Sequence, residues 1–175
     1  MPAETCILTT KDFTILEAMR DRCQDLSGPY GTLLRRKLDT AQLVLCDDVP
    51  ADVPTLNSRV TFSVDGRDPD TRVLSQDRMP AAVGMFLPIT TLRGLALLGL
   101  AEGQAVVVGN QEGREEMLSV EKVSYQPEAT RREREMLRRA AIPSGRPRLR
   151  VIEGGANGLA AFASPVPDDP GPSAA

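Results

Sequence analysis

Three cysteines, Cys6, Cys23 and Cys46, are the side chains of this 175-residue chain best suited to act as nucleophiles or to bind a soft metal ion. They are widely spaced, no Cys-x-x-Cys pair occurs, and the chain has no histidine to complete a zinc site or serve as a general base. No neighbouring residue would activate a thiolate. We therefore expect reduced, buried thiols of a cytoplasmic protein, with no metal ion, no cofactor and no catalytic residue.

Three glycines, Gly94, Gly99 and Gly103, interrupt the apolar stretch TTLRGLALLGLAEGQ at residues 90–104. Their spacing matches neither a phosphate-binding loop of the Gly-x-x-x-x-Gly-Lys-Ser/Thr type nor a Gly-x-Gly-x-x-Gly dinucleotide turn. Charged residues also interrupt the stretch well before the roughly 20 apolar residues that cross a bilayer, so we expect no membrane contact. We interpret it as a short helix that ends near Gly99 and turns at Gly103, because glycine adopts a positive φ without strain.

Two amphipathic segments within residues 7–48 predict a short antiparallel helical hairpin, or coiled coil. Thr9 and Asp12 are spaced as in a capping box, and apolar residues then recur at helical spacing as far as Leu26. A Gly-Pro step breaks this helix, and a second apolar face continues to Leu45. The periodicity leaves two arrangements open: the helices pack on each other and on little else, or they form part of a larger core.

Residues 55–127 follow a proline-containing linker and show the alternation that is typical of β-strands. We expect about five antiparallel strands, at residues 58–64, 71–76, 82–89, 104–110 and 115–126. A change of alternation phase near Glu121 and Lys122 predicts a β-bulge in the last strand. With the helical hairpin and one short helix among the strands, the fold class is α+β.

The composition changes beyond residue 127. Residues 128–142 have high helix propensity and few apolar positions, so we expect a marginal, basic helix there. Residues 143–175 are rich in Pro, Gly, Ala and Ser, and we expect a disordered tail. The chain up to residue 127 has a net charge of −5, whereas the part beyond it has +2, with all of its arginines between Arg131 and Arg150. This arginine stretch either contacts DNA or an acidic surface, or only aids solubility.

Four segments of the chain resemble the Gre family of bacterial transcription factors. They are KLDTAQLV (37–44), TLNSRVTFSVDG (55–66), LRGLALLGLAEGQAV (92–106) and VSYQPEA (123–129). The resemblance covers roughly residues 7–129, and within the family it is strongest to the short-coil type known as the regulator of nucleoside diphosphate kinase. The residues that match the family motif Ser-Pro-Leu-Gly-x-Ala-Leu-Leu-Gly, followed by Gly-Asp, are Thr91 (for Ser), Gly94, Ala96, Leu97, Leu98, Gly99 and Gly103. Leu92 and Gln104 depart from the proline and the aspartate of that motif.

The resemblance implies an N-terminal coiled coil joined to a C-terminal domain of FKBP-like fold, which docks on RNA polymerase near the rim of its secondary channel. We therefore expect a non-enzymatic transcription regulator that modulates elongation or competes with other channel-binding factors. The expected contact surface is a loop and helix start, where backbone N–H groups and a cation meet the partner. Its residues are Ile89, Thr90, Thr91, Leu92 and Arg93. The leucines expected to hold this edge in place from the core are Leu95, Leu97 and Leu98.

FKBP-like folds elsewhere isomerise prolyl bonds in an apolar pocket lined by aromatic residues. The corresponding part of this chain contains few aromatic side chains, namely Phe62, Phe86 and Tyr125. We therefore expect no prolyl isomerase activity.

In long-coil members of the family, an acidic pair at the tip of the coil helps hold a catalytic Mg²⁺ and a water, and the polymerase then cleaves its own transcript. The tip in this chain falls around residues 21–32, where Asp21 and Asp25 are one helical turn apart. They form either such a pair or two solvated carboxylates, and the short coil favours the second. Two alternatives remain beside the polymerase-binding regulator: a stimulator of transcript cleavage, and an interaction module that acts, indirectly, on nucleoside diphosphate kinase.

Overall fold

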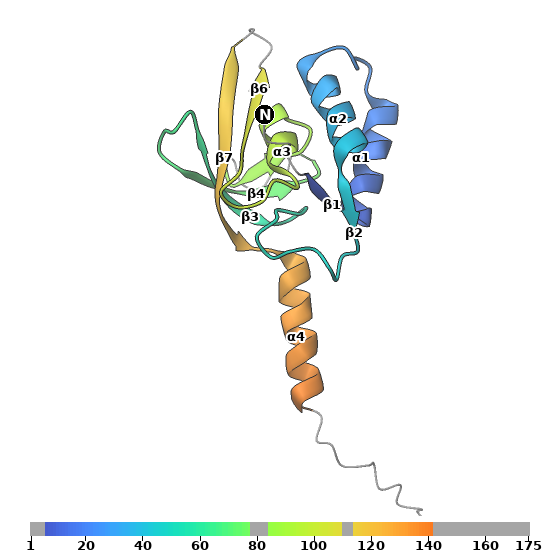
Figure 1. The fold of residues 1–175 in the computed structure, drawn as a ribbon, viewed down its shortest axis with the longest axis vertical. Coiled ribbons are helices and arrows are strands. Elements are labelled where there is room, and N and C mark those ends of the chain that lie inside the picture. Colours follow the sequence, from blue (N-terminus) through green and yellow to red (C-terminus); the bar gives the residue numbers. More distant parts are fainter. Residues whose placement is uncertain (1–5, 78–83, 110–113, 142–175) are drawn as a thin grey trace, which may run out of the picture. The chain divides into compact units, whose positions relative to one another are not determined.

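The computed structural model describes residues 6–77, 84–109 and 114–141, which all lie in one compact unit (Figure 1). The tail expected at residues 143–175 lies outside the described residues. The elements in chain order are β1 (Ile7–Thr9), α1 (Thr10–Arg22), α2 (Pro29–Thr40), β2 (Gln42–Val44), β3 (Arg59–Val64), β4 (Asp70–Ser75), β5 (Phe86–Pro88), α3 (Leu92–Leu97), β6 (Ala105–Gly109), β7 (Glu115–Tyr125) and α4 (Pro127–Ala141). The predicted α+β class is confirmed.

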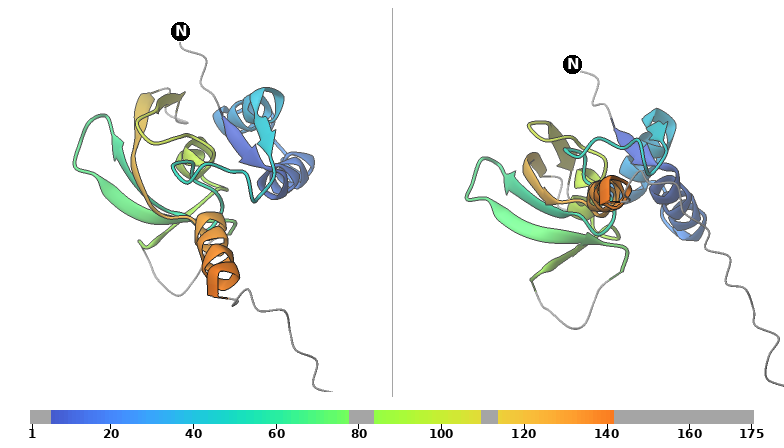
Figure 2. Two further views of the ribbon diagram at one scale, coloured as in Figure 1. Left: turned by 60° about the horizontal axis from the view of Figure 1, so that its bottom comes forward. Right: turned by 90° about the horizontal axis from the view of Figure 1, so that it is seen from below.

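Five strands form a sheet in the order β5-β4-β3-β7-β6, and the sheet curls around α3 (Figures 1 and 2). β3 pairs antiparallel with β4 and β7, and β7 pairs antiparallel with β6, so the strands predicted in these four places are confirmed. For the fifth strand, the described residues from Gly84 on form a strand at Phe86–Pro88. The prediction of its direction is wrong, because it pairs parallel with β4. β5 lies beside Val73–Ser75, the second half of β4, and a parallel neighbour needs a longer connection than a two-residue hairpin turn.

β7 contains two β-bulges, which increase the local twist of the sheet. Thr61 of β3 is opposite Lys122, whereas the next residue of β3 is opposite Val120, so Glu121 is an extra residue. This is the bulge that the change of alternation phase predicted. A second shift of register leaves Ser124 without a partner position near the end of the strand.

α1 begins where the sequence predicts and ends earlier. The Thr9 hydroxyl accepts a hydrogen bond from the Asp12 N–H at 3.0 Å and so caps the first turn. The predicted helix reaches Leu26, but α1 ends at Arg22. The Asp25 carboxylate accepts the backbone N–H groups of the second and third residues after it, at 2.9 and 3.0 Å, and this local turn competes with a further turn of helix.

α2 begins at Pro29, because proline is favoured at the first position of a helix, and it ends at Thr40 rather than near Leu45. The next residues, Gln42–Val44, form β2, which pairs parallel with β1. Neither of these strands was predicted, because three residues are too few to show an alternation. Leu45 is consequently 62% exposed instead of lying on a helix face.

The helices α1 and α2 share one hydrophobic core with the sheet. Leu16 of α1 and Leu34 of α2 are fully buried in the same cluster as the three leucines of the α3 region that were expected to be buried. Of the two arrangements that the periodicity left open, the structure has the larger, shared core. Gly99 and Gly103 follow α3 with φ angles of +76° and +77°, as the turn prediction requires.

All three cysteines are free thiols. Cys6 is buried, as expected, between β1 and the end of α3. Cys23 and Cys46 are only half-buried, so the expectation of burial is wrong for these two. Cys23 directly follows the end of α1 and Cys46 lies two residues beyond β2, in segments whose residues are mostly exposed.

α4 follows β7 and extends beyond the sheet (Figure 1). Glu128 is its one buried residue among those described, while Met136 and Leu137 are 68% and 70% exposed. A helix of 15 residues with so little buried apolar surface is marginal on its own. Among the described residues, no helix combines the length and the apolar character needed to cross a membrane.

Asp12 is a buried carboxylate in the first turn of α1, with a relative exposure of 1%. Neither carboxylate oxygen has a hydrogen-bond partner of good geometry, although the Thr9 side chain and the Leu56 backbone lie near enough to lower its pKa. Burial outweighs them and, together with the charge of Glu128, raises the pKa of Asp12 to about 6 from the ordinary 3.8. The ionised form of Asp12 therefore opposes folding.

Asp12→Asn should make the protein more stable than the wild type at neutral pH but not at pH 4. The Asp12 carboxyl binds its proton more tightly in the folded protein than in the unfolded chain. Protonation of Asp12 therefore stabilises the folded state fully below about pH 4, and this stabilisation is lost as the pH rises through about 6. The shift corresponds to roughly 3 kcal/mol in the free energy of unfolding. Urea denaturation of both proteins from pH 4 to pH 8 measures it, and a difference that stays constant over this range would contradict the prediction.

Candidate functional site

The loop from Ile89 to Arg93 joins β5 to α3, and its first residue holds it to the core. Ile89 is fully buried; its N–H donates to the Ser75 carbonyl at 2.8 Å, and its carbonyl accepts the Tyr30 hydroxyl at 2.9 Å. Burial raises the pKa of Tyr30 to about 12, so the hydroxyl remains a donor at physiological pH. Ile89 thus occupies a supporting position, and it ties the loop to both β4 and α2.

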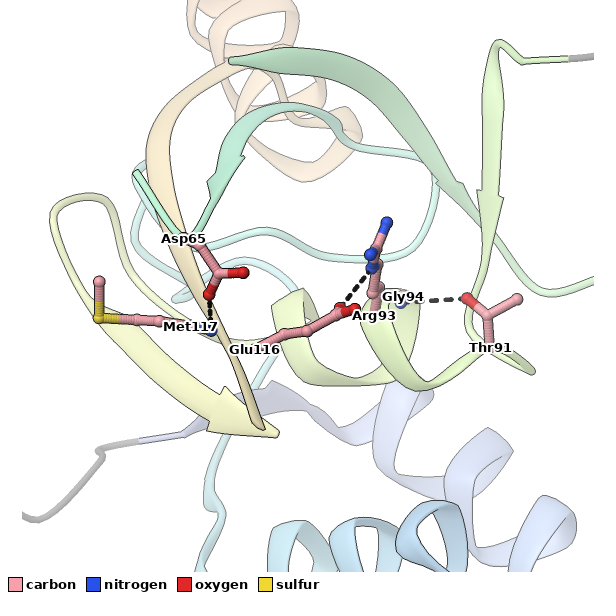
Figure 3. A network of polar contacts seen from close by, with 6 residues as sticks. All are labelled: Asp65, Thr91, Arg93, Gly94, Glu116 and Met117. Carbon is pink, nitrogen blue, oxygen red and sulfur yellow. Dashed lines mark hydrogen bonds and ion pairs between the residues drawn. The ribbon is translucent and has the colours of Figure 1, made fainter. Parts of the chain in front are cut away.

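Thr91 fixes the start of α3. Its hydroxyl donates to the Pro88 carbonyl at 2.7 Å. The same hydroxyl accepts the Gly94 N–H at 3.2 Å, which is the geometry of an N-cap (Figure 3). A serine hydroxyl forms the same two bonds, so Thr91 keeps the role that the motif gives to serine. Thr90 is exposed and Leu92 is half-buried, so these two side chains lie at the surface on either side of the cap.

Arg93 forms an ion pair with Glu116 of β7, with 2.8 Å between Nε and Oε2 (Figure 3). The Arg93 side chain is still 47% exposed, against 22% for Glu116. Their hydrogen bond raises the pKa of Arg93 and lowers the pKa of Glu116. Asp65, which accepts the Met117 N–H at 2.8 Å, adds negative charge nearby. The cation expected at this edge is therefore present: it is the Arg93 guanidinium, and its ion pair with the Glu116 carboxylate orients it.

Sequence reasoning did not find two residues that build this site, Glu116 and Tyr30. Each of them contacts the loop from far away in the chain, at separations of 23 and 59 positions. The sequence holds no local signal for such pairings, because hydrophobic periodicity and motif spacing describe only neighbouring residues.

Gly94 allows α3 to pack closely against the end of β5. A Cβ atom at Gly94 would lie 2.2 Å from the Pro88 oxygen and 2.7 Å from the Pro88 carbonyl carbon. Because both atoms belong to the backbone, they cannot rotate away as a side chain would. The glycine at this motif position thus keeps the start of α3 within hydrogen-bond reach of β5.

An apolar hollow of about 330 Å³ lies beside the loop. Three elements line it: Leu92 comes from α3, Val107 and Val108 come from β6, and Pro29 and Leu33 come from α2. Val107 is 48% exposed, so the hollow is open to solvent on the side of β6. A hollow of this kind beside Leu92 can accept an apolar side chain of a partner.

The two carboxylates expected at the tip, Asp21 and Asp25, do not share a helix face. Asp21 lies in the last turn of α1, where its carboxylate accepts hydrogen bonds from the Arg20 guanidinium at 3.1 and 3.2 Å. Asp25 lies beyond the end of the helix, and its carboxylate binds the N–H groups of Ser27 and Gly28. Within the part of the chain that the structure describes, no three acidic or sulfur side chains are grouped so that they would hold a metal ion.

No family model matches the chain. A protein of Escherichia coli (strain K12) named regulator of nucleoside diphosphate kinase is 28% identical over 130 residues, which are 74% of this chain and 96% of that protein. The protein of the same name from Shigella flexneri matches with the same figures. A solved structure titled prokaryotic transcription elongation factor GreA/GreB from Nitrosomonas europaea is 25% identical, with a TM-score of 0.54, and the match covers 69% of this chain and 98% of that one. The resemblance that the motifs indicated is therefore confirmed, and the fold is Gre-family-like.

Gly94→Ala should destabilise the protein by about 2–4 kcal/mol, because the new methyl group would overlap the Pro88 backbone and force α3 away from β5. Gly109→Ala is the matched control: a Cβ there meets nothing within 4 Å, and its φ is not positive. The control should change the free energy of unfolding by less than about 1 kcal/mol. Urea denaturation compares the two, and equal stabilities would contradict the close approach.

Proposed function

We propose that this chain, with its Gre-family-like fold, is a non-enzymatic transcription regulator that binds RNA polymerase near the secondary channel. There it modulates elongation or competes with other factors that enter the channel. The observation that carries the proposal is the match to a transcription elongation factor along 98% of that protein's chain. The name of the Escherichia coli relative supports the same broad class, a regulator.

In this proposal the chain has two working parts. The five-stranded sheet with α3 is the FKBP-like domain, over residues 55–127, and α1 with α2 is the short coil within residues 7–48. The hydrophobic core that they share supports this assignment, because it fixes the direction of the coil relative to the docking surface. A coil with a fixed direction can be aimed into a channel.

The polymerase-binding surface in this proposal is the start of α3 with the hollow beside it. Thr90, Leu92 and Arg93 provide the contacts, because their side chains are exposed or half-buried. Ile89 and Thr91 anchor the loop to the body of the protein through their hydrogen bonds to α2, β4 and β5. Glu116 holds the guanidinium in one orientation, which lowers the entropy that binding costs.

The geometry of the tip supports a regulator rather than a stimulator of cleavage. α1 has 13 residues and is therefore only about 20 Å long. The carboxylates of Asp21 and Asp25 lie on different local structures, and each already accepts two hydrogen bonds. A shared Mg²⁺ needs carboxylate oxygens that converge, so these two residues are solvated surface groups in this proposal.

An effect on nucleoside diphosphate kinase is a second function that a specific observation favours, since the Escherichia coli relative carries it in its name. In this proposal the effect is indirect and follows from altered transcription. It needs no contact between this chain and the kinase.

Arg93→Glu should weaken the binding of purified RNA polymerase about tenfold or more, because it places a carboxylate where the partner meets a guanidinium. The double variant Arg93→Glu/Glu116→Arg restores the ion pair with its direction reversed. It should melt near the wild-type temperature and still bind weakly, which separates binding from folding. Surface plasmon resonance with immobilised polymerase gives the affinities.

The control for this experiment is Arg72→Glu, which breaks another partly exposed ion pair, between Arg72 and Asp70 on β4. It should bind polymerase like the wild type. Wild-type affinity in both Arg93 variants would exclude the start of α3 as the contact surface.

The protein should not increase transcript cleavage by backtracked polymerase complexes above the rate of the polymerase alone. Because the two tip carboxylates do not converge, Asp21→Ala/Asp25→Ala should leave this result unchanged. Denaturing gels of labelled transcripts measure cleavage. Stimulated cleavage that disappears in the double variant would replace the regulator with the cleavage alternative.

A further inference from the structure

α4 has a surface that polymerase binding, as proposed, does not use. Its start is fixed to the body of the protein, since the Thr55 hydroxyl donates to the buried Glu128 carboxylate at 2.6 Å and the Gln126 amide donates to the Val53 carbonyl at 2.6 Å. Beyond Arg132, the hydrogen bonds and ion pairs found in the described part of the chain lie within the helix itself. The last turns of α4 are therefore surrounded by solvent (Figures 1 and 2).

The exposed part of α4 is basic on one side. Residues 131–141 contain five arginines and two glutamates, whereas residues 1–127 have a net charge of −5. At about 100° per residue, the arginines fall within an arc of roughly 160° around the helix axis. They are Arg131, Arg132, Arg134, Arg138 and Arg139. These five side chains form the arginine face of α4. No eleven-residue segment elsewhere in the described chain contains five cationic residues, and residues 1–127 carry a net negative charge.

Two carboxylates orient the arginine face without neutralising it. Arg131 pairs with Asp47, and Glu135 pairs with Arg138 and Arg139 at 3.5 and 3.2 Å. These three arginine side chains remain 63%, 76% and 77% exposed. A hollow of about 500 Å³, lined by three of the arginines, lies where α4 leaves the body. The guanidinium groups are thus held in place and still available to anions.

We propose that α4 binds duplex DNA through its backbone phosphates. Guanidinium groups bind phosphate oxygens in pairs, and the arginines extend over about 12 Å of the helix axis. A protein partner would favour a larger apolar centre than the single methionine, Met136, that lines the hollow beside α4 with the arginines. The major groove of B-form DNA, about 12 Å wide, admits a helix, whereas the deep and narrow major groove of duplex RNA does not.

The test is fluorescence anisotropy of the full chain with a labelled 20-base-pair DNA duplex at several salt concentrations. For three to five phosphate contacts, the plot of log affinity against log salt should have a slope of about −3 to −4.5. Arg134→Gln/Arg138→Gln should weaken binding about tenfold at low salt and make the slope less negative by about 2. Leu137→Gln is the matched control on the same helix, because Leu137 does not line the hollow, and it should bind DNA like the wild type.

Circular dichroism of the variants shows that α4 remains helical, so that lost binding reports on charge. Wild-type DNA affinity in the arginine variant would overturn the proposal, as would equal loss in the uncharged control or equally tight binding of duplex RNA. The arginine variant should also retain its affinity for polymerase. The proposal of DNA binding and the proposal of polymerase binding can therefore be contradicted separately.

Discussion

The close approach of the backbone at two glycines of the α3 region is the constraint on which the rest of the structure depends. A Cβ atom at Gly94 would lie 2.2 Å from the Pro88 carbonyl oxygen. A Cβ atom at Gly99 would lie 2.6 Å from the Ile7 carbonyl oxygen. The first contact joins α3 to β5 and the second joins it to β1. α2 reaches the same place, because the Lys37 ammonium donates to the carbonyl of the residue that caps α3, at 2.5 Å. One short helix thus connects the sheet, the small parallel strand pair and α2.

Local patterns predict those parts of the fold that a few neighbouring residues determine. Alternation predicts four of the five sheet strands, its change of phase predicts the bulge at Glu121, and turn chemistry predicts the positive φ angles of Gly99 and Gly103. The patterns fail where a distant segment decides the outcome. β1 and β2 are short and pair across the whole of α1 and α2, and the parallel pairing of β5 with β4 joins segments that no tight turn connects.

The candidate site divides in the same way. Motif spacing predicts a loop and helix start at residues 89–93, which depends on a few adjacent residues. It does not predict that Ile89 faces the core or that Arg93 shares its charge with Glu116, since both results depend on α2 and β7. For the tip carboxylates, the spacing of one helical turn assumes a continuous helix, and the side chain of Asp25 itself provides the turn that follows the end of α1.

In the proposed function, the start of α3 is a docking surface, and the shared core fixes the direction of a short coil. The central claim of this proposal is that RNA polymerase is the partner. The most direct measurement is affinity purification of the tagged full chain from the cells that produce it, followed by quantitative mass spectrometry. The account predicts that the large subunits of RNA polymerase dominate the captured proteins over an untagged control. Capture of other proteins without enrichment of polymerase subunits would contradict it.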